Sequence, residues 1–225
     1  MLINIAIIFI SYLIGALPHL YYLCKLRKID TTGDLHQNLW QKAGIFWGSC
    51  GILIDILKGV IPILLGKVLG LDLSIIVVCG LAAVAGQMWP VFSKFDGEKG
   101  NTTGLGIALT LAYQPTLVAL VPVLYALISK LVRLTNIKGQ SFRNRFRLGA
   151  GKSDALPIGV ALGFLVLPIV SYWLVEPIEM VIGFIILFLI IILRRLTQGL
   201  TKDLKNPRDL KRVLYNRLLY DRSQH

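Results

Sequence analysis

The stretch GQMWPVFSKFDGEKGNTTG, residues 86–104, is a short polar segment, rich in glycine, that separates two long apolar runs. Apolar runs of roughly 20 residues are long enough to cross a membrane as helices. We therefore expect this stretch to form a loop at the membrane surface, beside the start of a helix. Its glycines, lysine and hydroxyl groups are of the kind that hold a phosphate. An ordinary turn between two spans is the alternative interpretation.

Composition places the chain among polytopic helical membrane proteins. Of its 225 residues, 55% are hydrophobic and only 16% are charged, an apolar excess that soluble domains of this size do not carry. A transmembrane β-barrel would show short alternating segments instead of long apolar runs. We expect one membrane domain, residues 1–195, followed by a basic cytoplasmic tail, residues 196–225.

The net charge of +12 suggests nucleic acid binding, but the positions of the cations argue against it. Of the 24 lysine and arginine residues, 22 lie in four polar regions that flank apolar runs, namely residues 25–42, 94–99, 130–154 and 194–225. Positively charged loops mark the cytoplasmic side of a membrane protein. Basic segments next to a membrane also attract anionic lipid headgroups. We therefore predict contacts with membrane lipids and no nucleic acid partner.

The fold class that we predict is all-α, with about seven transmembrane helices, two of them short. The apolar runs span residues 2–24, 43–65, 73–90, 104–132, 155–175 and 178–193. All four basic regions lie on one side only if the run 104–132 crosses twice, turning at residues 113–115. This topology places the N-terminus outside and the C-terminus in the cytoplasm. Beyond Pro207 the tail fits an amphipathic surface helix or a solvated segment.

The glycine-rich loop holds the first candidate site residues. Gly97 and Gly100 allow a ligand to approach the backbone closely, and Lys99 supplies a mobile cation. Thr102 and Thr103 could cap the helix that follows and place the loop at its positive end. The spacing is not that of a Walker motif, and no strand precedes it. The cysteines and histidines lack the spacing of a metal site, so we predict no metal and no cofactor.

Asp55 and Lys58 form a second candidate group, within the second apolar run. Three residues apart, they share one helix face and are able to pair. A charge at the bilayer centre costs roughly 2.5–3.5 kcal/mol, so such residues are candidates for function, although a structural ion pair also fits. Gln87, at the end of the third run, could reach a ligand with its amide. We interpret His19 as a packing residue, and the spacing of His36 does not single it out.

Three segments resemble one known family. They are SYLIGALP at residues 11–18, KAG at 42–44 together with DILKG at 55–59, and the glycine-rich stretch at 86–104. The last is similar to a signature of a glycine–histidine pair, proline, an aromatic residue, phenylalanine, Gly-Gly-Lys-Gly and threonine. That signature belongs to the bacterial acyl-phosphate:glycerol-3-phosphate acyltransferase family, which this chain resembles as a divergent member. The similarity covers most of residues 1–132 and, in span pattern only, the rest.

The resemblance implies a seven-span enzyme of the bacterial inner membrane whose active site faces the cytoplasm. The implied reaction is attack of the glycerol-3-phosphate hydroxyl on an acyl phosphate, which gives lysophosphatidic acid and phosphate without a metal, a cofactor or a covalent acyl-enzyme. An enzyme that produces acyl phosphate is implied as a partner. The implied catalytic residues are Lys99 and Gln87, and the implied substrate- and phosphate-binding residues are Gly97, Gly100, Thr102, Thr103, Asp55 and Lys58.

The chain departs from the family pattern at several positions. Gln87 stands where the family has histidine, Glu98 where it has glycine, and Ala16 where serine is usual. The first loop is shorter, and residues 195–202 lack the family's histidine and asparagine. A glutamine cannot act as a general base near neutral pH. An inactive or re-purposed relative that binds lipid phosphates or a membrane partner is therefore the alternative function. A small transporter is disfavoured because the polar loop lies at one surface.

Overall fold

The computed structural model describes residues 2–135, 155–200 and 210–221, and every regular element in this part of the chain is helical. Six stretches are long and apolar enough to cross a membrane: Leu2–Leu26, Ile45–Val68, Leu73–Ser93, Tyr113–Val132, Ala155–Trp173 and Ile178–Thr197. Large apolar side chains cover the outside of the bundle, as expected for a surface in contact with lipid. The predicted fold class, an all-α polytopic membrane protein, is confirmed.

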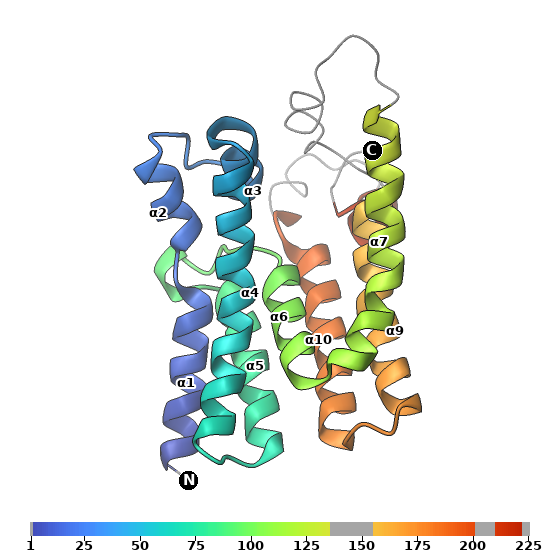
Figure 1. Ribbon diagram of the computed structural model, residues 1–225. Coiled ribbons are helices and arrows are strands. Elements are labelled where there is room, and N and C mark those ends of the chain that lie inside the picture. The colour runs from blue at the N-terminus through green and yellow to red at the C-terminus, as the bar shows by residue number, and fades with distance from the viewer. Residues whose placement is uncertain (1, 136–154, 201–209, 222–225) are drawn as a thin grey trace.

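The helices form an upright bundle (Figure 1). Its elements, in chain order, are α1 (Leu2–Ala16), α2 (His19–Leu26), α3 (Leu35–Asn38), the π-helical turn η1 (Leu39–Ala43), α4 (Ile45–Val68), α5 (Leu73–Met88), the 3-10 turn η2 (Val91–Ser93), α6 (Asn101–Leu111), α7 (Tyr113–Thr135), α9 (Ala155–Trp173), α10 (Ile178–Thr197) and α12 (Leu210–Tyr220). The first apolar run is broken between α1 and α2 at Pro18, which has no N–H to continue the helix.

The fourth apolar run reverses direction between α6 and α7 (Figure 1). Ala112 leaves the helical region with φ −145° and ψ 84°, and α7 begins at Tyr113. Gln114 and Pro115 therefore lie in the first turn of α7 and not in the turn itself, because proline is tolerated at a helix start. With 11 residues, α6 is about 16 Å long, shorter than the roughly 30 Å hydrocarbon core. The number of crossings and the sidedness of the termini stay predictions.

Helices α4 and α6 approach each other closely because both carry glycine at the contact. A Cβ atom at Gly59 would overlap the carbonyl oxygen of Thr103, and one at Gly106 would overlap that of Ile56. Small residues that let two backbones meet are typical of helix packing in membranes. The contact presses the first turn of α6 against the middle of α4, where Asp55 lies.

The C-terminal tail folds in part as helix α12, which packs on α9 and α10 and buries Asn216 and Arg217. The boundary at residue 195 between the membrane domain and the tail stays a prediction. Helix α10 continues two residues beyond it, to Thr197. Most of the basic region 133–152, for which we predicted attraction to anionic lipid, lies outside the described residues.

The predicted sidedness can be tested with single cysteines at Thr31 and Tyr172, both of which are exposed. Thr31 lies in the first basic loop, whereas Tyr172 lies at the far end of α9, so the positive-inside rule places them on opposite sides. We expect a membrane-impermeant maleimide applied to intact cells to label Tyr172→Cys and to spare Thr31→Cys until the cells are lysed. The parent chain gives the background from its own cysteines. Labelling of both in intact cells would contradict the topology.

Candidate active site

Asp55 of α4 is fully buried and is the centre of a polar cluster. Its carboxylate accepts hydrogen bonds from Gln87 Nε2 to Oδ1 at 2.7 Å and from Thr102 Oγ1 to Oδ2 at 3.1 Å. His36 Nε2 lies 2.8 Å from Oδ2. The three partners come from α5, α6 and α3, so the cluster joins distant parts of the chain. A buried carboxylate is tolerated only with such partners, because its loss of hydration is otherwise uncompensated.

Lys58 pairs only loosely with Asp55, at 3.8 Å from Oδ1. Its Nζ donates instead to the carbonyl oxygen of Leu17 at 2.7 Å. That carbonyl lies at the break before Pro18 and also accepts the backbone N–H of His19, at 3.0 Å. Lys58 therefore connects α4 to the α1–α2 break, and the sequence prediction that it binds a phosphate stays a prediction.

His19, which the sequence suggested was a packing residue, also faces the cluster. Its Nε2 lies 3.4 Å from Asp55 Oδ1 and 3.2 Å from the carbonyl oxygen of Gly51. His36 was not singled out by its spacing, and it reaches Asp55 because α3 folds back over α4. The sequence offers one signal for this contact: His36 shortly precedes an apolar helix that carries Asp55.

Thr102 and Thr103 lie in the first turn of α6, which begins at Asn101. The expectation that they cap this helix is therefore wrong, because the helix begins before them. Gly100 is the N-cap, with φ +73°, and no side chain caps the helix. The hydroxyl groups bind α4 instead: Thr103 Oγ1 donates to the carbonyl oxygen of Asp55 at 2.8 Å. Without a side-chain cap, the first N–H groups of α6 can serve an anion.

The glycine-rich loop is closed by its own backbone. The backbone N–H of Gly97 donates to the carbonyl oxygen of Met88 at 3.2 Å. The backbone N–H of Glu98 donates to the backbone carbonyl oxygen of Gln87 at 3.1 Å. A Cβ at Gly97 would overlap the Gln87 carbonyl oxygen, so this fold of the loop requires glycine. Because its N–H is used within the loop, a role for Gly97 in anion binding stays a prediction.

The end of α10 holds the loop from the other side. Arg194 is buried, and its guanidinium donates to the carbonyl oxygen of Gly97 and to Asp96 Oδ1, the latter at 3.1 Å. Gln198 Nε2 also donates to Gly97 O, at 3.1 Å. Neither residue is among the predicted site residues, because nothing in the local sequence indicates that α10 ends beside a loop about a hundred residues earlier in the chain.

Glu98 lies near the cluster, and burial raises the pKa of its carboxyl group. The charge of His36 opposes this shift, and the carboxylates of Asp34 and Asp55 add to it. Lys99 pairs with a different carboxylate: its Nζ lies 2.6 Å from Asp221 Oδ2, just after the end of α12. The predicted site residues thus fall into two groups, one gathered around Asp55 and one at Lys99.

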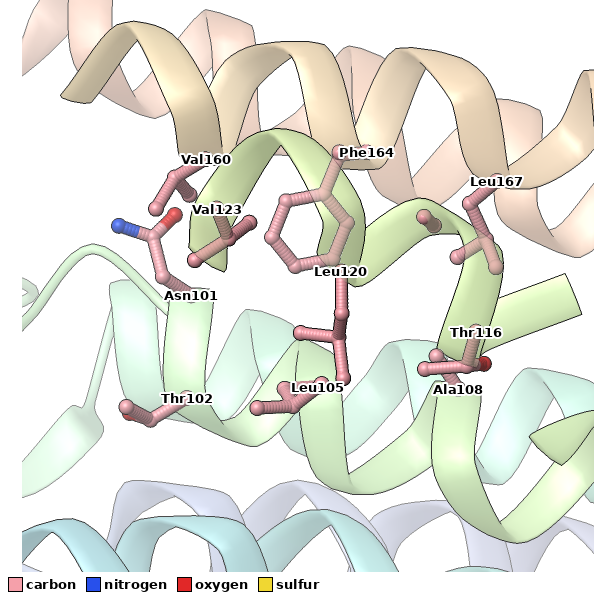
Figure 2. Close-up of a pocket in the computed structure, with 12 residues that line it drawn as sticks. Asn101, Thr102, Leu105, Ala108, Thr116, Leu120, Val123, Val160, Phe164 and Leu167 are labelled. Carbon is pink, nitrogen blue, oxygen red and sulfur yellow. The ribbon is translucent and has the colours of Figure 1, made fainter. Parts of the chain in front are cut away.

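An apolar pocket of about 180 Å³ lies next to the cluster, between α6, α7 and α9. Figure 2 shows Asn101 and Thr102 at one end of it, with Leu120, Val123 and Phe164 along its length. Thr102 belongs both to this pocket and to the Asp55 cluster. Asn101 Oδ1 and Gln87 Oε1 are buried without a hydrogen-bond partner among the described residues, and such atoms mark places where a polar ligand or water fits.

Fold and site together define a multi-pass helical membrane protein with an internal polar cluster beside an apolar pocket. Comparison with known proteins then assigns the family. The sequence profile described as "Glycerol-3-phosphate acyltransferase" matches residues 5–199, and the chain belongs to this family. The family predicted from the sequence is thereby confirmed.

Curated relatives carry the same name. Glycerol-3-phosphate acyltransferase 4 of Dehalococcoides mccartyi strain CBDB1 is 32% identical over 224 residues, covering 94% of this chain and 86% of the relative. The glycerol-3-phosphate acyltransferase of Thermosipho melanesiensis is 32% identical over 151 residues, covering 64% and 74%.

Two crystal structures share the fold. Both are of PlsY, described as an integral membrane glycerol 3-phosphate acyltransferase, one in a lysophosphatidic acid form and one in a glycerol 3-phosphate form. They superpose with TM-scores of 0.65 and 0.63 at 22% and 21% identity. Each alignment covers 90% of this chain and 92% of the other.

The contact between His36 and Asp55 predicts a pH-dependent stability. Burial lowers the pKa of His36, but the hydrogen bond and the charge of Asp55 outweigh it, so the pKa is raised above 6.5. The folded protein thus holds the proton more tightly than the unfolded chain does. The stabilisation is complete below the unfolded pKa and is lost as the pH rises through the folded pKa.

We expect the melting temperature of the wild type in detergent to fall more than that of His36→Gln between about pH 6 and about pH 9. Glutamine keeps an N–H donor but does not titrate. Glu98 also has a raised pKa, which gives a slope of the same sign, and the charge of His36 acts on it, so both proteins are compared in a Glu98→Gln background that removes this contribution. Equal slopes for the two proteins would contradict a charged contact.

Proposed function

We propose that this protein transfers an acyl group from an acyl phosphate to the hydroxyl group of glycerol-3-phosphate, giving lysophosphatidic acid and phosphate. The observation that carries the proposal is the position of Thr102. It binds the polar cluster on one side and lines the apolar pocket on the other. An acyl phosphate has the same two parts, an anionic head and a hydrocarbon chain. The family match over residues 5–199 supports the same reaction.

The reaction needs positioning more than it needs a strong base. The hydroxyl oxygen attacks the carbonyl carbon, a carbon–oxygen bond forms, and the bond from that carbon to the phosphate oxygen breaks. Phosphate leaves with the electron pair, and the hydroxyl proton passes to phosphate or water. Because an acyl phosphate is an activated anhydride, aligning the two anions and stabilising the developing charge are sufficient.

We assign the stabilisation of charge to Lys99 and to the uncapped N-terminus of α6, which together form the positive side of the site. We assign Asp55 a positioning role without substrate contact, because both of its carboxylate oxygens already have hydrogen-bonding partners within the protein. Gln87 keeps Asp55 in place through its amide N–H. Its replacement of the family's histidine is therefore compatible with activity.

The acyl chain fits the pocket between α6, α7 and α9, which is lined mainly by apolar side chains. The acyl phosphate then binds from the membrane, whereas glycerol-3-phosphate binds from the aqueous phase. We place the site on the cytoplasmic face of a bacterial inner membrane, because the flanking loops are basic. An enzyme that produces acyl phosphate would deliver the donor at that face.

Lys99 gives the direct test. Purified protein supplied with acyl phosphate and glycerol-3-phosphate should release phosphate and form lysophosphatidic acid. Lys99→Ala should lower kcat/KM at least about a hundredfold, the usual cost of losing a group that stabilises developing charge. Lys94→Ala is the matched control, since Lys94 is exposed in the same loop and should retain nearly full activity. A wild-type protein that neither turns over nor rescues a cell lacking this enzyme would overturn the proposal.

The pocket predicts chain-length selectivity. Val123 lines the pocket, whereas Val121 on the same helix is 61% exposed on the outer surface. Val123→Trp fills the cavity, so we expect it to lower kcat/KM for a long-chain acyl phosphate about tenfold more than for a short-chain one. Val121→Trp should leave the ratio unchanged. The measurement is the ratio of kcat/KM for a long-chain acyl phosphate to that for a short-chain one. The same ratio in both variants would show that the acyl chain of the substrate binds outside this pocket.

A further inference from the structure

Helix α12 lies beyond residues 5–199, the part of the chain that the family profile matches, yet it is built into the bundle. Its Asn216 and Arg217 are buried. The guanidinium of Arg217 donates to the carbonyl oxygens of Leu196, in the last turn of α10, and of Gln198, the residue that follows the helix. The helix is therefore fixed beside the part of α10 that holds the glycine-rich loop.

The C-terminal end of α12 delivers a carboxylate to Lys99. Asp221 follows the last helical residue in the left-handed conformation, with φ +56°, and its N–H bonds to the carbonyl oxygen of Arg217 at 3.1 Å. Its Oδ2 lies 2.6 Å from Lys99 Nζ, and its backbone carbonyl oxygen lies 3.5 Å from the same atom. The ammonium group is thus held by a side chain and by the negative end of a helix.

A second buried cation lies at the end of α10. Arg195 is 2% exposed, and its Nη1 donates to the carbonyl oxygen of Pro157 at 2.9 Å. Its Nε and Nη2 have no hydrogen-bond partner among the described residues. Lysine and arginine donors of this kind bind carboxylates and phosphates alike. Asp221 therefore lies where an anionic ligand of Lys99 would lie.

We propose that α12 is an internal competitor of the anionic substrate: the Asp221 carboxylate occupies the anion position at Lys99 and leaves when a phosphate group binds there. This proposal rests on the proposed function insofar as it assigns the anion position to a substrate phosphate. The described conformation is the self-inhibited one, and the active conformation has Lys99 released from Asp221.

The size of the effect follows from exposure. The side chain of Lys99 is 34% exposed, so solvent screens the pair, and such a contact changes an equilibrium by about two- to fivefold. A substrate that must displace Asp221 binds with an apparent affinity reduced by the same factor. The tail then sets the substrate concentration at which the enzyme responds and leaves the maximal rate unchanged.

Asp221→Asn in the full-length protein is the decisive variant, because asparagine keeps the left-handed conformation while removing the charge. We expect its KM for glycerol-3-phosphate to fall about two- to fivefold with kcat unchanged. Glu179→Gln, a charge removal in the first turn of α10, is the matched control and should behave as the wild type. A raised KM or a lowered kcat in Asp221→Asn would overturn the proposal, because Asp221 would then position Lys99 for catalysis.

A chemical readout tests the tail without turnover. A water-soluble acetylating reagent should modify Lys99 about two- to fivefold faster in Asp221→Asn than in the wild type, with exposed Lys94 as the internal reference measured by mass spectrometry. Inorganic phosphate should slow the modification in the variant at lower concentration than in the wild type.

The two proposals can fail separately. Faster labelling of Lys99 in the variant, with phosphate protection but without turnover, supports the competitor and removes the acyltransferase function. Equal labelling rates in the two proteins overturn the competitor whatever the activity is.

Discussion

Asp55 carries a carboxylate within a helix that is long and apolar enough to cross a membrane, and the rest of the polar structure depends on satisfying it. A buried carboxylate without partners is far too costly to keep. His36, Gln87 and Thr102 contribute those partners from three other elements. Because each partner has to reach one side chain, this single constraint sets how α3, α5 and α6 meet α4. The glycines at the contact of α4 and α6 make that approach sterically possible.

The polar groups of the site divide into two sets with different tasks. Those around Asp55 bond to one another, and in the proposed function they hold the site in position. Those at the far side of the loop, Lys99 and the start of α6, retain donors that an anion can use. This division explains how a glutamine can occupy position 87. In the proposed function the task there is to donate a hydrogen bond to Asp55, which the amide of Gln87 does.

The loop between the two sets is held from three directions. Its own backbone pairs with the end of α5, Arg194 and Gln198 hold the Gly97 carbonyl from α10, and Thr103 fixes the following helix to α4. A rigid loop keeps Lys99 near one place, where its charge can be used either by a substrate or by Asp221. Helix α12 thus acts on the site through a loop that has little freedom to move away.

The sequence by itself determined the membrane class, the apolar spans, the glycine-rich loop, the family and the pairing face of Asp55 and Lys58. These depend on composition, run length and spacing along one helix, which are local properties. Only the tertiary structure decided that His36 reaches Asp55, that Arg194 holds the loop, and that Asp221 meets Lys99 from 122 residues away. Such contacts follow from how helices cross and which faces pack together. In the sequence these residues are not distinguishable from other charged and polar residues of loops and helix ends, because only the fold places them at the site.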